Sequence, residues 1–214
     1  MTLPGELQVV DDVPQAFAAF VAREAPASIA LSGGSTARKC YDLLAAVDVA
    51  WQDVEIFFGD ERWVPVDDPE SNEGMARVAF VDQVNPAAVH SMRRAGETIE
   101  AAADAYDRLL REHAPVELVH LGLGPDGHTA SLFPGSPALD EHDRFVVPSG
   151  DDLHNHPRLT WTYPAIARSR LVVFTVAGDE KHDALRRVKE GDELPAARIT
   201  AERIVWLVDE AANS

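Results

Sequence analysis

The chain has 214 residues, of which 46% are hydrophobic and 26% charged, a composition typical of a globular protein rather than of a disordered, collagen-like or coiled-coil chain. Its 19 basic and 36 acidic side chains give a formal net charge of −17 at pH 7, which argues against nucleic acid and anionic membranes as partners. An anionic small molecule would need a local site, built from backbone N–H groups and a few placed basic side chains.

Targeting signals and cysteine chemistry are also disfavoured. No apolar run approaches the length needed to span a bilayer. The first residues carry no basic stretch followed by an apolar block, as a secretory signal would. Cys40 is the only cysteine, so neither an intrachain disulfide nor a cysteine-based zinc site can form. These features predict a cytoplasmic protein.

Helices and strands are expected to alternate along the chain. The patterns predict helices over 11–25, 35–47, 72–84, 97–113 and 181–189, and strands over 28–31, 54–58, 117–121, 158–163, 171–176 and 204–208. This alternation predicts an α/β fold with a parallel or mostly parallel sheet. Because no repeat or long linker interrupts it, we expect residues 1–214 to form one domain.

Three irregular segments directly follow predicted strands, at 32–36, 59–65 and 122–135. In open α/β sheets, ligands bind in the crevice at the carboxyl ends of the strands. We therefore expect these three segments to meet at one edge of the sheet and to form a binding site.

The first segment predicts an anion site. Gly33 and Gly34 allow successive N–H groups to point at one ligand, and Ser35 and Thr36 add hydroxyl groups where a helix begins. The Gly-Lys-Ser/Thr ending of a nucleoside triphosphate loop is missing, which disfavours that class of ligand. A tight turn followed by a helix cap is the structural alternative.

The second segment places an acid, an acid and a base in succession, at Asp60, Glu61 and Arg62. The carboxylates could orient water or bind a sugar hydroxyl, and Arg62 could bind a phosphate or a developing oxyanion. The alternative is a cluster of ion pairs at the surface. Ser71 and Asn72 could cap the next helix or reach the site.

The third segment contains Gly122, Gly124 and Gly127, which match G-x-G-x-x-G. A dinucleotide site requires a full helix after the third glycine. Here His128 follows at once, and Pro134–Gly135 would end any helix within about two turns. We therefore predict no nicotinamide cofactor, and a loop whose backbone approaches a small ligand.

His128 is the best candidate for a proton acceptor, because histidine titrates near neutral pH and this one lies in a glycine-rich segment after a strand. Either Asp126 or Asp60 could orient its ring. His154 and His156 are separated by one residue, but no third ligand is indicated, so we expect a solvated loop there and no metal site. No Gly-x-Ser-x-Gly segment is present, which disfavours a serine acyl-enzyme.

Together, LSGGST at 31–36, DERWVP at 60–65 with the later SN, and GLGPDGHTASLFPG at 122–135 resemble the 6-phosphogluconolactonase family in the same order. The resemblance covers nearly the whole chain. It implies the three-layer α/β sandwich, with a mostly parallel sheet, of glucosamine-6-phosphate deaminases and ribose-5-phosphate isomerases. It also implies cofactor-free hydrolysis of 6-phospho-D-glucono-1,5-lactone to 6-phosphogluconate in the oxidative pentose phosphate pathway.

The resemblance assigns roles to individual positions. Two departures stand beside it: Ala37 replaces a frequent proline, and residues 149–157, SGDDLHNHP, lack a Lys-Pro run. The matching positions imply a phosphate site at 33–36 with Arg158 and Lys181, a general base at His128, and Asp60 and Arg62 close to the reacting atoms, with Asp126 as a candidate partner of the base.

Two alternatives from other functional classes remain open. An amino-sugar phosphate deaminase or a sugar-phosphate isomerase on the same scaffold also needs proton transfer beside a phosphate loop. A non-catalytic sugar-phosphate sensor would bind the ligand without turnover. Release of ammonia from glucosamine 6-phosphate would identify the first, and binding without reaction the second.

Overall fold

The computed structural model describes residues 3–93, 98–150 and 155–214. Its main feature is a sheet in the order β1-β10-β9-β6-β2-β3-β5, in which every pair of neighbours is parallel. The expected α/β fold with a mostly parallel sheet is thereby confirmed. The strands are β1 Glu6–Val9, β10 Arg203–Val208, β9 Leu171–Val176, β6 Leu118–Gly122, β2 Ser28–Leu31, β3 Glu55–Phe58 and β5 Ala88–Val89.

A second, antiparallel sheet consists of β4 Asp60–Arg62, β8 Arg158–Trp161 and β7 Val146–Ser149. The prediction of an irregular loop throughout 59–65 was therefore wrong for residues 60–62. A strand of three charged residues carries no apolar alternation by which it could be detected. It forms because its partner β8 supplies the hydrogen bonds, in a register that sets Asp60 opposite Thr160.

Each predicted helix has a counterpart, with different bounds: the one predicted over 72–84 is divided into three short pieces, and the one over 181–189 spans 182–190. The strand predicted over 158–163 ends at 161, because residue 163 begins a short helix. Side chains accept from backbone N–H groups at the first turns of α1, α3 and α5: Asp12 from Gln15, Ser71 from Gly74 and Thr98 from Ala101. No helix within the described ranges is long and apolar enough to cross a bilayer. The helices are α1 Val13–Glu24, α2 Ser35–Leu44, α3 Asn72–Ala76, a π-helical turn Arg77–Val81, α4 Asp82–Val84, α5 Ile99–His113, α6 Tyr163–Ile166, α7 His182–Glu190 and α8 Glu210–Asn213.

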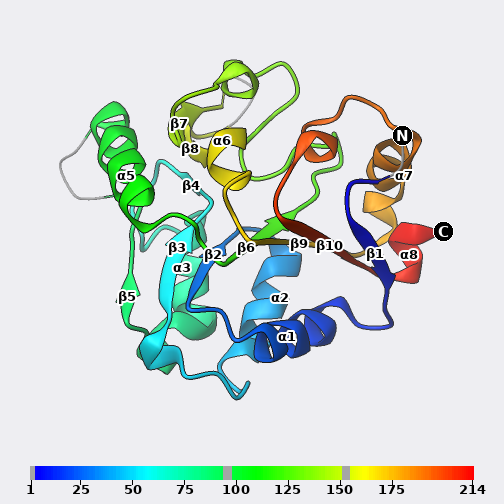
Figure 1. Ribbon diagram of the computed structural model, residues 1–214, viewed down its shortest axis with the longest axis horizontal. Helices are drawn as coiled ribbons and strands as arrows, with labels where there is room; N and C mark the ends of the chain where they lie inside the picture. The colour runs from blue at the N-terminus through cyan, green and yellow to red at the C-terminus, as the bar shows by residue number, and fades with distance from the viewer. Residues whose placement is uncertain (1–2, 94–97, 151–154) are drawn as a thin grey trace.

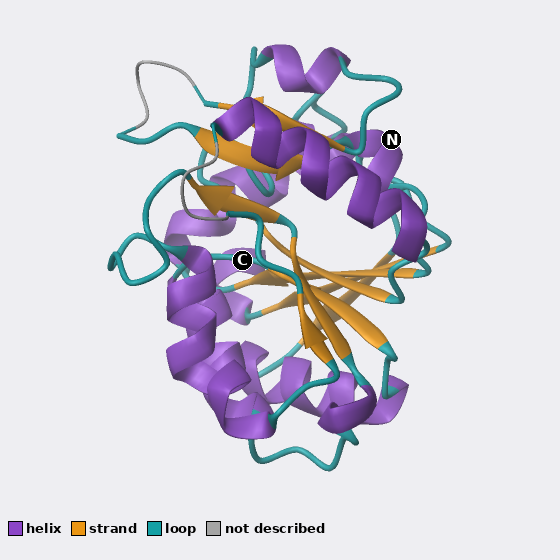
Figure 2. Ribbon diagram, turned by 90° about the vertical axis from the view of Figure 1, so that its left-hand side faces the viewer, coloured by secondary structure: helices purple, strands orange, loops and turns teal. Residues whose placement is uncertain are grey.

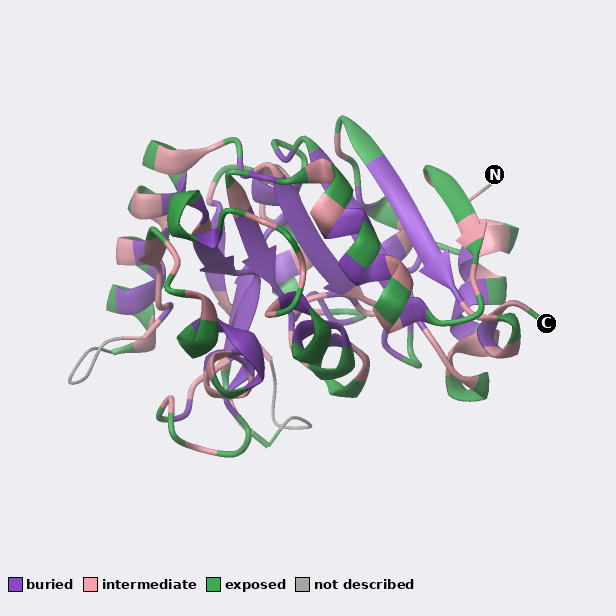
Figure 3. Cartoon of the chain, turned by 90° about the horizontal axis from the view of Figure 1, so that it is seen from below, coloured by how far each residue is buried: buried purple, intermediate pink, exposed green. Residues whose placement is uncertain are grey.

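The elements are arranged in layers around the large sheet. Helices α1 and α2 lie against one face, where both contact β9, and α5 with the small sheet lies on the other side (Figure 1, Figure 2). Seen from below, the central strands are buried while the outward faces of the helices are exposed (Figure 3). All six residues of β9 are buried, as expected for a parallel strand covered on both faces.

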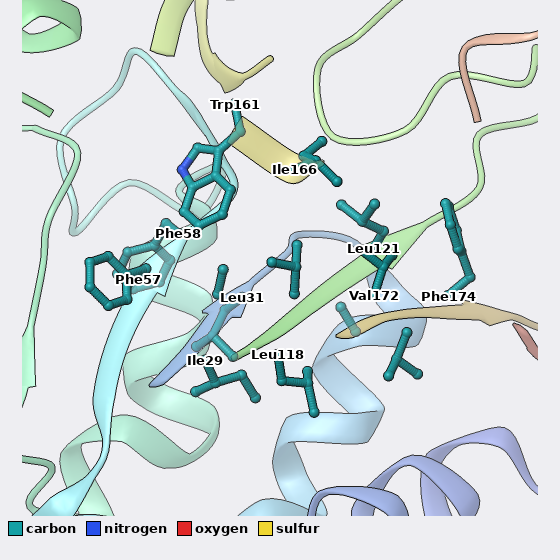
Figure 4. Close-up of a cluster of buried hydrophobic side chains, with 14 of the residues drawn as sticks. Ile29, Leu31, Phe57, Phe58, Leu118, Leu121, Trp161, Ile166, Val172 and Phe174 are labelled. Carbon is teal, nitrogen blue, oxygen red and sulfur yellow. The ribbon is translucent and has the colours of Figure 1, made fainter. Parts of the chain in front are cut away.

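The hydrophobic core continues from the large sheet to the small one. Ile29, Leu31 and Phe58 of the large sheet belong to the same buried cluster as Trp161 of β8 and Ile166 of α6 (Figure 4). Because this packing fixes β8 against the large sheet, it also fixes β4, which pairs with β8. The charged residues of β4 are thus held at a defined place.

Candidate active site

A cavity of about 470 Å³ opens at the carboxyl ends of β2, β3, β6 and β9. The loop after β2, residues 32–37, is called the anion loop below, and the loop after β6, residues 122–133, the histidine loop. The structure brings every residue that the sequence analysis proposed for the site to the wall of this cavity: Gly33, Gly34, Ser35, Thr36, Asp60, Arg62, Asp126, His128, Arg158 and Lys181.

The anion loop presents unpaired backbone donors. Gly34 precedes the first residue of α2 with a φ of 99°, a conformation that favours glycine, and no side chain caps this helix. The first hydrogen bond of α2 runs from the Arg38 N–H to the Gly34 carbonyl, and within the described residues the N–H groups of 33–37 make none. These donors, at the positive end of a helix dipole, suit an anion.

Asn72 connects the anion loop to β4. A Cβ at Gly33 would lie 1.9 Å from the Asn72 Oδ1, so the loop can approach this amide only because residue 33 is glycine. The Asn72 Nδ2 donates to the carbonyl of Asp60 at 3.0 Å, and its Oδ1 accepts from the Arg62 Nη1 at 3.2 Å. Asn72 lines the cavity while Ser71 caps α3, so both possibilities considered for this pair are realised.

The histidine loop holds the ring of His128 in a fixed orientation. Its Nδ1 lies 2.5 Å from the Asp126 Oδ1, which also accepts from the His128 backbone N–H at 3.1 Å. A Cβ at Gly124 would lie 2.1 Å from the same Nδ1, so the ring packs directly on that glycine. Of the two carboxylates considered, Asp126 is therefore the one that orients His128.

Electrostatics keep Asp126 ionised. Partial burial pushes the pKa of its carboxyl up, but the backbone N–H and the ring of His128 outweigh this, so the pKa lies below its usual range. A carboxylate that accepts from Nδ1 keeps the proton there and leaves Nε2 as the basic atom. The His128 side chain is 29% exposed, so a ligand can reach it.

Asp60 has a different environment. It is buried and accepts from the Ser131 Oγ at 2.7 Å. Burial raises the pKa of its carboxyl, against the opposing effects of the Ser131 hydroxyl, the two nearby arginines and His128. Asp60 therefore lines the cavity near His128, but its carboxylate is hydrogen-bonded to Ser131 and not to the His128 ring.

Arg62 and Arg158 are paired across β4 and β8. Burial lowers the pKa of the Arg158 guanidinium, and repulsion by Arg62 lowers it further. The buried Arg158 Nη1 has no hydrogen-bond partner in the described part of the chain, whereas Arg62 donates to the carbonyl of Glu70 at 2.8 Å. Two adjacent guanidinium groups with a free donor are suited to an anionic ligand.

Lys181, the residue that precedes α7, also lines the cavity. No ion pair joins it to another described residue. Together with the two arginines and the anion loop, it gives this acidic protein the local positive site that its overall charge required.

The alternative of a surface ion-pair cluster at 60–62 does not hold, because Asp60 and Glu61 are buried. Strand alternation separates them: Asp60 and Arg62 line the cavity, and Glu61 does not. Glu61 accepts from the Ser71 hydroxyl at 2.9 Å and from the backbone N–H of Asn72 at 2.7 Å. Burial raises the pKa of its carboxyl despite these donors. Its role is to fix the start of α3.

A buried polar chain that sequence reasoning missed supports the anion loop. The Tyr41 hydroxyl accepts from the Ser32 N–H at 2.7 Å and lies 2.8 Å from the His120 Nδ1, while the His120 Nε2 lies 2.8 Å from the Thr175 Oγ1. Burial lowers the pKa of His120 to about 3, so its ring is neutral. Ser32 and Thr175 line the cavity. The sequence signal that could have revealed this chain was His120, a histidine inside the otherwise apolar strand β6.

Of the two histidines considered as a metal pair, His154 and His156, the structure describes only His156. His154 lies outside the described residues, as do residues 151–153 of the segment that departs from the family pattern. The His156 Nε2 lies 3.9 Å from the Glu70 Oε2, a distance at which only a weak ion pair forms.

Comparisons with known proteins identify the relatives of this chain. The family described as Glucosamine-6-phosphate isomerases/6-phosphogluconolactonase matches residues 6–206. A relative from Synechocystis named 6-phosphogluconolactonase is 42% identical over 208 residues, which cover 90% of this chain and 86% of that protein. One of the same name from Mycobacterium leprae is 41% identical over 214 residues, 91% of this chain and 86% of that protein.

Solved structures show the same relationship. A 6-phosphogluconolactonase from Shewanella baltica superposes with a TM-score of 0.83 at 29% identity, covering 97% of this chain and all 100% of that chain. A monomeric glucosamine-6-phosphate deaminase reaches the same TM-score of 0.83 at 19% identity, over 97% of this chain and 98% of that one. The latter likeness concerns the fold alone.

Proposed function

Because the chain belongs to the glucosamine-6-phosphate isomerase/6-phosphogluconolactonase family, we propose that it hydrolyses 6-phospho-D-glucono-1,5-lactone to 6-phosphogluconate at the cavity around His128. This reaction belongs to the oxidative pentose phosphate pathway, and we place the enzyme in the cytoplasm. One observation carries the proposal: an oriented imidazole and an unpaired anion loop line the same cavity.

The phosphate of the substrate occupies the anion loop. The free N–H groups of residues 33–37 donate to its oxygens, and Lys181 and Arg158 supply the positive charge. Because the phosphate is attached at the far end of the sugar from the lactone carbonyl, these contacts orient the ring rather than take part in bond breaking.

His128 acts as the general base. Its Nε2 removes a proton from a water molecule as the water oxygen attacks the C1 carbonyl, and the carbonyl oxygen becomes an oxyanion stabilised by Arg62 or by loop N–H groups. When the tetrahedral intermediate collapses, the bond between C1 and the ring oxygen breaks, and protonated His128 returns the proton to that oxygen. Asp126 stabilises the ring while it is charged.

Buried Asp60 has a positioning role in this scheme. It binds Ser131 of the histidine loop and, at 3.4 Å, the Asn72 amide that contacts the anion loop. It thereby sets the spacing between the base and the phosphate site, and a change of spacing of about 1 Å can cost about 10²-fold in rate.

A rapid assay with freshly generated 6-phosphogluconolactone, corrected for spontaneous hydrolysis, tests the proposal. We expect the protein to accelerate the appearance of 6-phosphogluconate, and no ammonia to be released from glucosamine 6-phosphate. Ammonia release would instead favour the deaminase alternative, and tight binding of 6-phosphogluconate with no acceleration would favour a sensor.

A further inference from the structure

Glu55, His90 and His113 form a cluster at the opposite end of β3 from the cavity. Glu55 is the first residue of β3, His90 follows β5 and His113 is the last residue of α5. One ligand atom from each lies within 4.8 Å of the others. None of the three lines the cavity, and three strand residues, a rise of about 13 Å, separate Glu55 from Gly59, which precedes the cavity-lining Asp60.

Both imidazoles present Nε2 to the same carboxylate oxygen. The Glu55 Oε2 lies 2.8 Å from the His90 Nε2 and 3.6 Å from the His113 Nε2. A tetrahedral zinc ion holds its ligands about 3.3 Å apart, with metal–ligand distances of about 2.0–2.2 Å. The three atoms therefore need only small shifts to surround one ion, which would replace the proton that the His90 Nε2 donates to Glu55 and release it to solvent.

Neighbouring groups hold the two rings in ligating orientations. The His113 Nδ1 lies 2.8 Å from the carbonyl of Leu109, which can only accept, so this nitrogen carries the proton and a neutral ring presents its lone pair at Nε2. The ring of Phe57 stacks on His90 with centroids 4.3 Å apart. A backbone carbonyl that fixes the tautomer is the usual outer contact of a metal-bound histidine.

The centre of the cluster can accept a cation. When the His113 ring is neutral, its Nε2 lone pair faces a carboxylate oxygen 3.6 Å away, and no hydrogen bond joins these two atoms. A cation between them would remove this repulsion. We propose that Glu55, His90 and His113 bind a divalent transition metal ion of the zinc class. Two imidazoles and one carboxylate match that class, whereas calcium and magnesium take oxygen ligands.

The site is open enough for an ion to enter. The side chains of His90, His113 and Glu55 are 14%, 32% and 37% exposed, so water can complete the coordination. The bound ion would link the end of α5 to the start of β3 and to the residue after the edge strand β5. Its role is therefore structural, and thermal stability is the property it should change.

The test uses His128→Asn protein, so that the imidazole of the cavity cannot bind zinc. After treatment with a chelator and dialysis, zinc sulfate is titrated by calorimetry, and cobalt chloride is followed by the visible absorption of four-coordinate Co²⁺. We expect one saturable equivalent, and a rise in Tm of about 5 °C at a zinc concentration about a hundred times Kd.

Adding His113→Gln or Glu55→Gln should remove this equivalent, the cobalt spectrum and the rise in Tm. His142→Gln, which removes an exposed histidine elsewhere, should keep all three. The metal-free Tm of each variant shows whether it folds. Absence of saturable binding, or equal binding by the His113→Gln and His142→Gln proteins, would overturn the proposal.

Discussion

The histidine loop and the anion loop follow neighbouring strands, β6 and β2, but differ in how their polar groups are used. In the histidine loop, Asp126 holds His128, Thr129 bonds the carbonyl of Gly122, and Ser131 bonds Asp60. In the anion loop, successive N–H groups have no partner in the described structure. The polar side chains of the first loop are already held by partners within the protein, whereas the second loop leaves successive N–H groups available for a ligand.

This difference separates two kinds of contribution to catalysis. A group held in its reactive orientation lowers the barrier of the chemical step. Donors that wait for a ligand contribute to binding and orientation. We therefore expect substitutions in the histidine loop to lower kcat, and substitutions around the phosphate to raise KM.

Replacement of the base should have the largest effect. We expect His128→Asn to lower kcat by about 10²–10⁴-fold with a small change in KM, because general base catalysis contributes about that much. Steady-state rates with the lactone measure this, and the circular dichroism spectrum of the variant serves as the folding control. Unchanged turnover would exclude His128 as the base.

Removing the group that orients the base should have the next largest effect. Asp126→Asn can no longer hold the proton on Nδ1 or stabilise the charged ring, so kcat should fall by about 10²-fold at an unchanged KM. The double variant Asp126→Asn/His128→Asn distinguishes this role from a structural one, since a residue that acts only through His128 should cause no further loss of kcat once that base is gone. A normal kcat would show that packing on Gly124 and Phe133 is enough to position the ring.

Lys181→Ala should weaken substrate binding at the phosphate site rather than slow the chemical step. A hydrogen bond to a charged group contributes about 1.5–3 kcal/mol, so KM should rise about 10- to 100-fold while kcat changes little. Lys189→Ala in α7, the helix that follows Lys181, is the matched control, because the Lys189 Nζ donates to Asn213 away from the cavity. A fall in kcat with normal KM would place Lys181 at the chemical step instead.

The smallest effect concerns stability: His120 should lower the free energy of unfolding only at acidic pH. His120 titrates near 3 in the folded protein and near 6.5 when unfolded, so below pH 6.5 the unfolded chain gains a proton that the folded one does not, and stability falls. Between pH 7 and 5 the wild type should lose about 2 kcal/mol more than His120→Gln. Urea unfolding at both pH values measures this difference; equal losses would mean that His120 titrates normally.

The sequence was sufficient for the features that local patterns encode. The five central parallel strands are mostly apolar and were predicted, and the glycines of both loops follow strand ends, so the edge of the sheet that carries the site was predictable. The strands β1 and β5 were not predicted, because Glu6–Val9 is half polar and Ala88–Val89 has only two residues. Strand β4 was missed because its hydrogen bonds depend on β8, about a hundred residues later. For the same reason the environments of Asp60 and Glu61, adjacent in sequence and opposite in role, followed only from the pairing.

Long-range contacts also concealed the two polar clusters away from the reacting atoms. Tyr41 and His120 are 79 residues apart, and Glu55 and His90 are 35 apart, so neither pair forms a local motif. The expectation of no metal considered only His154 and His156, which are close in sequence. The three proposed ligands lie on separate elements, so the sequence has no short spacing by which they could be recognised.

If His128 is the base, its contact with Gly124 makes the activity of the protein depend on a residue that performs no chemistry. A methyl group there would overlap the ring and force the base to turn away, while the anion loop, on another strand, would keep its shape. One added carbon atom could thus separate capture of a phosphosugar from its conversion, which would give a protein that holds the intact lactone long enough to be observed.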